Sequence, residues 1–228
     1  MFLKIGHRGA AGLEPENTLM SFQKALDLGV DIIELDVHCL KTGRIIVIHD
    51  KKLDRTTDGK GYLREKGLSY IKNLNAGKGE KIPLLEEALD LINKKAIVNI
   101  ELKGEKTAKP VAEIIKKYVK EKNWDYNDFF ISSFNCSRLK KIKKILPKVK
   151  IGLLIKTNTK EYLKAAKNLN VFSINVPFNL IKIRKNIIKK LQGEGFRVFV
   201  WTVNKKRSIK RLKKMGVDGI ITDFPNKL

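Results

Sequence analysis

Short runs of β-branched and aromatic residues alternate along the chain with stretches in which apolar residues recur at helical spacing. The first pattern is typical of buried strands and the second of amphipathic helices. Strands are predicted at 2–7, 31–37, 96–103, 129–133, 150–155, 171–176, 196–203 and 219–222. Helices are predicted near 16–28, 84–94, 107–121, 136–146, 159–169, 180–193 and 205–215. The repeated strand–helix unit indicates a parallel sheet, because parallel strands need a long crossover.

The number of these units favours a closed barrel of the α/β class. Eight units in 228 residues suit a (β/α)8 TIM barrel better than an open doubly wound sheet. The G-x-G-x-x-G turn of dinucleotide-binding open sheets is absent from the sequence. With no linker or internal repeat, residues 1–228 are predicted to form a single TIM-barrel domain.

One segment interrupts the alternation after the second strand. The turn at 41–44 is too short for a helix, so the following residues 45–50 are expected to return antiparallel. A four-residue turn predicts Leu40 opposite Ile45 and Asp36 opposite His49. Residues 51–82 then read as a short insertion that caps the barrel mouth.

Composition excludes several classes of protein. Hydrophobic residues make up 43% of the chain, as a globular core requires, but no apolar run is long enough to cross a membrane. Cys39 and Cys136 are too few for a disulfide framework and too far apart for a zinc motif, so both are expected to be reduced and buried. The first motif begins at Gly6 and leaves no room for a secretory signal, which predicts a cytoplasmic protein.

The net charge of +24 is unevenly distributed. Residues 1–114 hold 19 basic and 17 acidic side chains, whereas residues 115–228 hold 29 and 7. Such an excess can attract nucleic acid or an anionic membrane surface. Yet the lysines of 140–144 alternate with apolar residues at helical spacing, as on a solvated helix face. We expect weak attraction to anionic surfaces and no specific nucleic-acid partner.

Carboxylates lie near the ends of two predicted strands, where barrel active sites form. Glu34 and Asp36 are two residues apart and so share a face, as do Glu101 and Lys103. A solvated strand edge or a Glu101–Lys103 ion pair would explain them without a ligand. Converging carboxylates repel one another unless a cation or proton intervenes, and oxygen ligands suit Ca²⁺ or Mg²⁺.

Two of the three histidines also fall at strand ends. His7 and His49 suggest a general acid–base pair, whereas His38 lies further out on the hairpin and is not expected to act directly. Arg8 and Lys103 add positive charge that, with a metal, can hold a phosphate group.

The chain contains eight short motifs: Gly6-His7-Arg8-Gly9, Pro15-Glu16-Asn17-Thr18, Glu34-Leu35-Asp36-Val37, His49-Asp50, Asn99-Ile100-Glu101-Leu102-Lys103, Ser132-Ser133-Phe134, Trp201-Thr202-Val203-Asn204 and Thr222-Asp223-Phe224-Pro225. Together they resemble the motifs of the glycerophosphodiester phosphodiesterases. Each motif alone is weak evidence, but all eight occur in the family's order and span nearly the whole chain.

The resemblance implies roles for individual residues. The acid–base histidines are His7 and His49. One divalent metal (Mg²⁺ or Ca²⁺) is bound by Glu34, Asp36 and Glu101. The substrate is contacted by Arg8 and Lys103 and, near the glycerol pocket, by Trp201. Asn17 and Asp223 match family positions too, but a structural role explains them equally well.

The implied activity is metal-dependent hydrolysis of glycerophosphodiesters, such as glycerophosphocholine and glycerophosphoethanolamine, to glycerol 3-phosphate and an alcohol. The sequence leaves open which histidine is the acid, and whether water or a glycerol hydroxyl attacks. It also leaves open the head group, the native metal and the oligomeric state. The alternative is a lysophospholipase D, which needs an apolar groove for an acyl chain. A more remote alternative is a non-enzymatic protein that binds anions or nucleic acid.

Overall fold

Eight parallel strands close into a ring in the computed structural model, which describes residues 2–157, 160–184 and 186–228. The strands are β1 (Leu3–Gly6), β2 (Ile32–Cys39), β4 (Ile97–Leu102), β5 (Phe129–Ser133), β6 (Lys150–Leu154), β7 (Ser173–Pro177), β8 (Arg197–Trp201) and β9 (Gly219–Thr222). Their order around the ring is β1-β9-β8-β7-β6-β5-β4-β2, and a β1–β2 pairing closes it. The predicted (β/α)8 TIM barrel is therefore confirmed.

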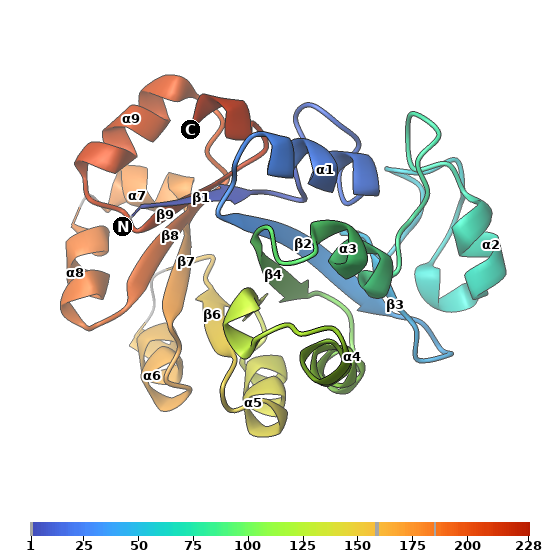
Figure 1. Cartoon of the computed structure of the whole chain (residues 1–228). Coiled ribbons are helices and arrows are strands. Elements are labelled where there is room, and N and C mark those ends of the chain that lie inside the picture. Colours follow the sequence, from blue (N-terminus) through green and yellow to red (C-terminus); the bar gives the residue numbers. More distant parts are fainter. Residues whose placement is uncertain (1, 158–159, 185) are drawn as a thin grey trace.

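Helices surround this ring (Figure 1). They are α1 (Leu19–Asp27), α3 (Leu85–Ile92), α4 (Ala108–Glu121), α5 (Cys136–Ile145), α6 (Lys160–Asn168), α7 (Phe178–Ile183), α8 (Ile187–Gly193) and α9 (Lys206–Lys214), with short 3-10 turns at Tyr126–Asp128 and Pro225–Lys227. Inside the barrel, Phe130 and Phe199 pack edge to face at 5.9 Å, together with Ile5, Ile32 and Ile221. This inner apolar layer fills the barrel interior, so the strand ends above it are left for polar side chains.

Two predicted helices differ from the structure. The first begins at Leu19 rather than near residue 16, because Asn17 has a left-handed backbone (φ 58°) and the Thr18 hydroxyl caps the helix by accepting from the Ser21 N–H. The predicted helix 180–193 is two helices, α7 and α8. An unbroken helix would turn Arg184 toward the buried stripe formed by Ile181 and Ile188, whereas the break at Arg184 keeps its side chain exposed.

The predicted antiparallel return is confirmed as β3 (Ile45–Val47), but its predicted register is wrong by one residue. Cys39 pairs with Ile45, and the carbonyl of Asp36 accepts from the N–H of Ile48 rather than lying opposite His49. The difference arises because Leu40 bonds to Arg44, which leaves three turn residues, with a left-handed glycine at 43. His49 follows the end of β3 and is free to turn toward the mouth.

Residues 51–82 form an insertion that packs against β3. Its helix α2 (Leu68–Asn73) and a 3-10 turn (Leu63–Glu65) bury a separate apolar cluster against the hairpin. The cluster consists of Leu40, Ile46, Ile48, Leu53, Leu63, Ile71, Leu74, Ala76 and Ile82. The insertion is where the sequence predicts it; its role as a cap and the single-domain organisation stay predictions.

Two smaller expectations concern the thiols and the membrane. Cys39 and Cys136 are free thiols but half-buried, so the expectation that they are buried is wrong. No helix in the described ranges is long and apolar enough to span a bilayer.

Candidate active site

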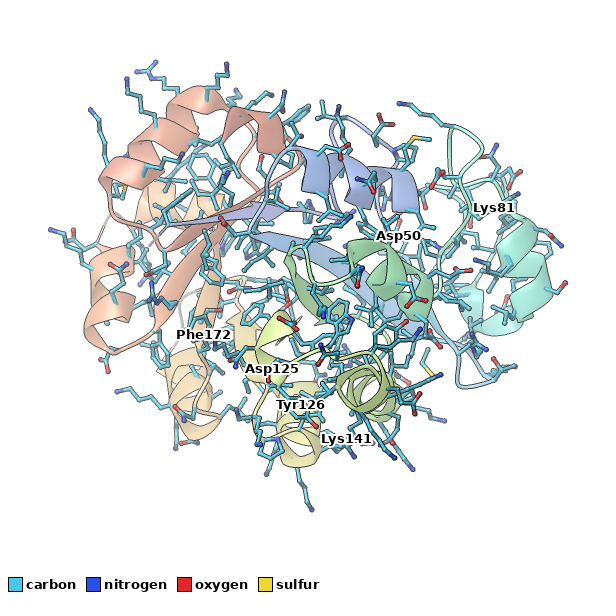
Figure 2. The ribbon with its side chains drawn as sticks, viewed as in Figure 1. Asp50, Lys81, Asp125, Tyr126, Lys141 and Phe172 are labelled. Atoms are coloured by element: carbon cyan, nitrogen blue, oxygen red, sulfur yellow. The ribbon has the colours of Figure 1, made fainter. Side chains whose placement is uncertain are left out.

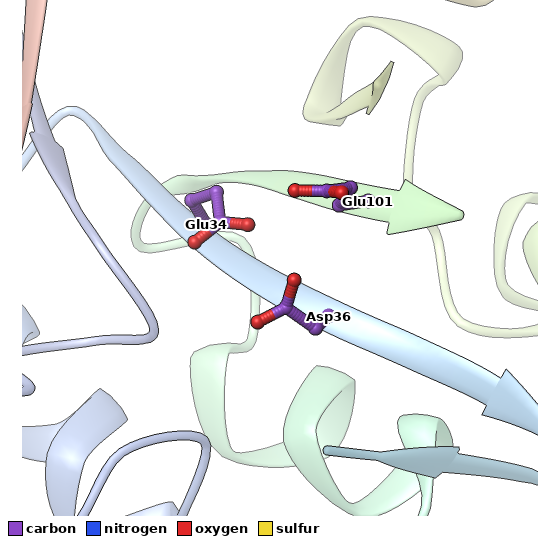
Figure 3. Close-up of side chains that lie close together, drawn as sticks. All are labelled: Glu34, Asp36 and Glu101. Carbon is purple, nitrogen blue, oxygen red and sulfur yellow. The ribbon is translucent and has the colours of Figure 1, made fainter. Parts of the chain in front are cut away.

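Three carboxylates converge at the mouth because of the register between β2 and β4. Asp36 is paired with Glu101 across these parallel strands, and Glu34 lies two residues earlier on the same face of β2. One oxygen of each residue lies within 4.8 Å of the others, and all three side chains are buried. Figure 3 shows Glu34, Asp36 and Glu101 directed toward one another from the two strands.

The electrostatics of this triad favour a cation. Burial, and then repulsion from Asp36 and Glu101, raises the pKa of Glu34 well above its ordinary value. Burial and the charge of Asp36 raise the pKa of Glu101 to about 7. Burial acts against ionisation of Asp36 as well, yet nearby cations, Arg8 first, hold its pKa below the usual value. A buried set of oxygen donors with this mutual repulsion fits a hard divalent ion, so the triad can bind a metal.

Each mouth histidine has a carboxylate at its Nδ1 atom. His7 Nδ1 lies 2.5 Å from Asp223 Oδ1, and its Nε2 lies 4.0 Å from Glu34. His49 Nδ1 bonds to Asp50, and its Nε2 lies 2.8 Å from Lys103 Nζ. A carboxylate on Nδ1 fixes both the ring orientation and the tautomer, so each Nε2 is the atom available for chemistry.

The contacts of His49 determine where its ring proton lies. Because an ammonium group only donates, Nε2 of His49 must accept the bond from Lys103 and its proton therefore sits on Nδ1. Burial lowers the pKa of His49, which favours this neutral form. His38 Nε2 donates to the backbone carbonyl of His49 at 3.1 Å, so His38 supports the position of His49.

The predicted substrate contacts line one small pocket with the two histidines. This pocket has a volume of about 90 Å³, and its walls include Arg8, Lys103 and Trp201. Trp201 donates its ring N–H to the carbonyl of Asn175 at 3.0 Å, so its ring serves as an apolar wall. Lys103 Nζ lies 3.2 Å from Glu101, and Arg8 Nε lies 3.2 Å from Asp36.

Two asparagines at the pocket carry buried polar atoms without a protein partner. Asn99 Oδ1 and Asn175 Nδ2 are among the few such atoms in the described ranges, and both residues line the pocket. Buried polar groups without partners are costly, so these atoms indicate contact with water or a ligand. Neither asparagine is among the predicted site residues, although alternation along β4 places Asn99 on the same face as Glu101.

The partners of the histidines are also absent from the predicted site. Asp50 directly follows His49, and this adjacency is a signal that it can reach the ring. Asp223 lies 216 residues from His7, and only barrel closure brings them together. Asn17 makes two hydrogen bonds to Asp36. Its Nδ2 donates to the Asp36 carboxylate at 3.0 Å, and its Oδ1 accepts from the Asp36 backbone N–H at 3.2 Å.

Comparison with known proteins identifies this arrangement. The model of the glycerophosphoryl diester phosphodiesterase family matches residues 7–227. The chain belongs to this family. It is 40% identical to a glycerophosphodiester phosphodiesterase from Caldanaerobacter subterraneus over 99% of this chain and 96% of that protein. Membership places the chain among the phosphodiester hydrolases.

Two further relatives bear on the substrate. A solved phosphodiesterase from Oleispira antarctica, in complex with the product sn-glycerol-3-phosphate, is 27% identical and superposes with a TM-score of 0.88 over 98% of this chain and 93% of its own. Human lysophospholipase D GDPD1 is 26% identical over 98% of this chain and 84% of its own length. The family resemblance in the sequence is confirmed, while the roles of individual residues stay predictions.

Proposed function

We propose that the protein hydrolyses glycerophosphodiesters such as glycerophosphocholine and glycerophosphoethanolamine to glycerol 3-phosphate and the free alcohol. One observation carries the proposal: two carboxylate-held histidines, Arg8 and Lys103 surround a single pocket beside a buried carboxylate triad. The product named for the solved Oleispira antarctica relative supports the same substrate class.

Substrate binding requires neutralisation of the phosphodiester charge. Arg8 and Lys103 supply positive charge at the pocket. The Trp201 ring suits the carbon chain of a glycerol group. The amide atoms of Asn99 and Asn175 that lack a protein partner suit the glycerol hydroxyls. One Mg²⁺ or Ca²⁺ held by Glu34, Asp36 and Glu101 would withdraw charge from the non-bridging oxygens when bound.

Proton transfer divides between the two histidines. With its proton on Nδ1, His49 offers a lone pair at Nε2 that accepts the proton of the attacking hydroxyl once Lys103 turns from Nε2 to the phosphate, so we assign His49 as the base. His7, whose Nε2 faces the pocket and whose Nδ1 is held by Asp223, then donates a proton to the leaving alkoxide. Asp223 accepts from Nδ1 and holds the His7 ring in the orientation that this role requires.

A lysophospholipase D is the second candidate, because a larger hollow lies outside the pocket. Its volume is about 900 Å³, and its walls include apolar residues such as Leu40, Leu63 and Pro110. However, the same walls carry Lys41, Lys51, Arg64, Lys106, Lys109 and Lys141. Charged walls and a reaction pocket of only about 90 Å³ favour the smaller, unacylated substrate. A non-enzymatic role would leave the convergence of histidines and carboxylates without explanation.

The test compares two substrates on the purified, metal-supplemented protein. We expect glycerophosphocholine to yield choline and glycerol 3-phosphate, and lysophosphatidylcholine to be cleaved much more slowly. A His49→Ala preparation, purified in parallel, controls for contaminating hydrolases. Faster turnover of lysophosphatidylcholine would favour the second candidate, and no turnover of either would contradict both.

We also propose a cytoplasmic location, where the thiols of Cys39 and Cys136 would stay reduced. Cell fractionation with an antibody to the protein tests it, and recovery from the culture medium would contradict it.

A further inference from the structure

One arginine of the insertion joins two carboxylates that belong to different parts of the mouth. Arg55 Nε donates to Asp50 Oδ2 at 2.6 Å. Its Nη1 and Nη2 atoms donate to the two oxygens of Glu16 at 2.7 and 2.8 Å. All three bonds use the fixed planar geometry of the guanidinium group, which a lysine cannot reproduce.

Each of these carboxylates holds a residue of the pocket. Asp50 uses its other oxygen, Oδ1, to bond Nδ1 of His49. Glu16 Oε1 accepts from Arg8 Nη1 at 2.7 Å. Arg55 is therefore linked to the proposed base, His49, through Asp50. It is linked to a predicted phosphate contact, Arg8, through Glu16.

The positive charge of Arg55 also affects the ionisation of the two carboxylates, Asp50 and Glu16. Hydrogen bonds from Arg55 are the largest cause of the lowered pKa of Asp50, and they help to lower that of Glu16 despite its burial. Both carboxylates therefore stay ionised and able to accept from their partners. Arg55 itself is half-exposed and lines neither the pocket nor the triad.

We propose that Arg55 is a positioning residue of this site: its guanidinium orients the His49 ring through Asp50 and the Arg8 side chain through Glu16. The insertion thereby helps to assemble the pocket without touching the substrate. The kinetic part of this inference rests on the proposed function, whereas the orientation of the His49 ring can be measured without turnover.

Another ion pair between the insertion and the barrel serves as a matched control. Lys78 Nζ lies 2.7 Å from Glu14, and neither residue lines the pocket. Lys78→Met removes an ion pair between the insertion and the barrel but leaves both ion pairs of Arg55, to Glu16 and Asp50, in place. A general loosening of the insertion should therefore affect both variants alike.

The kinetic experiment uses the full chain and glycerophosphocholine. Arg55→Met should lower kcat/KM about 10²-fold, because small misplacements of reacting groups cost that much, and Arg55→Lys should recover little of it. Asp50→Ala should mainly lower kcat, through His49, whereas Glu16→Ala should mainly raise KM, through Arg8. Near wild-type kinetics in Arg55→Met or Arg55→Lys, or an equal loss in Lys78→Met, would overturn the proposal.

A spectroscopic measurement decides the inference even if the proposed substrate is wrong. With only three histidines in the chain, the ring nitrogen signals can be resolved by NMR. The wild type and Lys78→Met should show His49 in one tautomer, with the proton on Nδ1. In Arg55→Met the ring is held less firmly by Asp50, so it should lose its bond from Lys103 part of the time and show a mixture of tautomers. An unchanged His49 signal in Arg55→Met would overturn the positioning role, and an inactive wild type would count against the proposed function alone.

Discussion

His7 and His49 have the same kind of partner at Nδ1 but different partners at Nε2. Both Nδ1 atoms bond to a carboxylate, but Nε2 of His49 accepts from Lys103, whereas Nε2 of His7 faces Glu34 at 4.0 Å. Because the Lys103 ammonium only donates, it requires a lone pair at Nε2 of His49. This contact supports the proposed role of His49 as the base and leaves His7 for the role of the acid.

We predict that His7→Ala and His49→Ala each lose most activity on glycerophosphocholine while remaining folded. Loss of a general acid or base costs about 10²–10⁴ in rate. A substrate with a nitrophenolate leaving group needs less protonation, so it should partly rescue His7→Ala but not His49→Ala. The measurement is kcat for both substrates. Rescue of His49→Ala alone would reverse the assigned roles.

Thermal unfolding is the control for these histidine variants. Both side chains are partly exposed at the mouth, at 18% for His7 and 28% for His49, so neither anchors the packed core. Each variant should keep a cooperative melting transition. If both variants lost this transition, the histidines would have a structural role and the acid–base assignment would be wrong.

The carboxylate triad gives a second prediction at this scale. Chelator-treated protein should lose turnover and regain it with Mg²⁺ or Ca²⁺, because the three buried carboxylates otherwise repel one another. Glu101→Gln should bind the ion more weakly by calorimetry, whereas Glu113→Gln, on the exposed face of α4, should bind like the wild type. Full activity after rigorous metal removal would contradict the metal requirement.

The elements explain how much of this site could be predicted from sequence. Alternation along a strand gives the shared faces of Glu34 with Asp36 and of Glu101 with Lys103. It does not give the register between β2 and β4, which is what places Asp36 beside Glu101. The one-residue error in the hairpin register has the same origin, because the number of turn residues cannot be read from 41–44 alone.

Contacts between distant side chains were beyond the sequence pattern. Arg55 and Glu16 are 39 residues apart, and each belongs to a segment with several other charges. Nothing in hydrophobic periodicity distinguishes Arg55 from Arg64, which contacts the ring of Tyr62 and its neighbour Glu65. The barrel itself was predictable because eight repeated strand–helix units leave few other topologies.

The ion pairs of the insertion predict how its stability depends on pH. The folded-state pKa values of Asp50 and Glu16 are lowered, so the stability they contribute is complete above their unfolded pKa values, near 4, and declines as pH falls. Arg55→Met removes the main cause of this shift for Asp50. The melting-temperature difference between wild type and Arg55→Met should therefore shrink between about pH 5 and about pH 2. A difference that stays constant with pH would contradict this account.

Over the whole molecule, the excess of basic residues follows the outer helices. The lysines of α5 and α9 alternate with buried apolar residues, Leu139 and Ile142 in α5, and Ile209 and Leu212 in α9. Figure 2 shows charged side chains around the whole outline of the protein, with Lys141 and Lys81 on different sides. Apart from the six cations that line the larger hollow, this distribution is that of solvated helix faces.

We therefore predict that nucleic-acid binding by this protein is weak, independent of sequence and strongly salt-dependent. A chain of net charge +24 will contact phosphates at low salt by releasing counterions, but the lysines of α5 and α9 lie on solvated helix faces, where they contact phosphates without reading bases. Fluorescence anisotropy with several unrelated duplexes of equal length should give the same affinity for each. That affinity should fall about 10³-fold or more between about 50 mM and about 200 mM salt. Glycerophosphocholine turnover should be far less sensitive over the same range, because its charges act inside a partly buried pocket. Tight binding of one duplex that persists at physiological salt would mean that the basic exterior forms a specific nucleic-acid site.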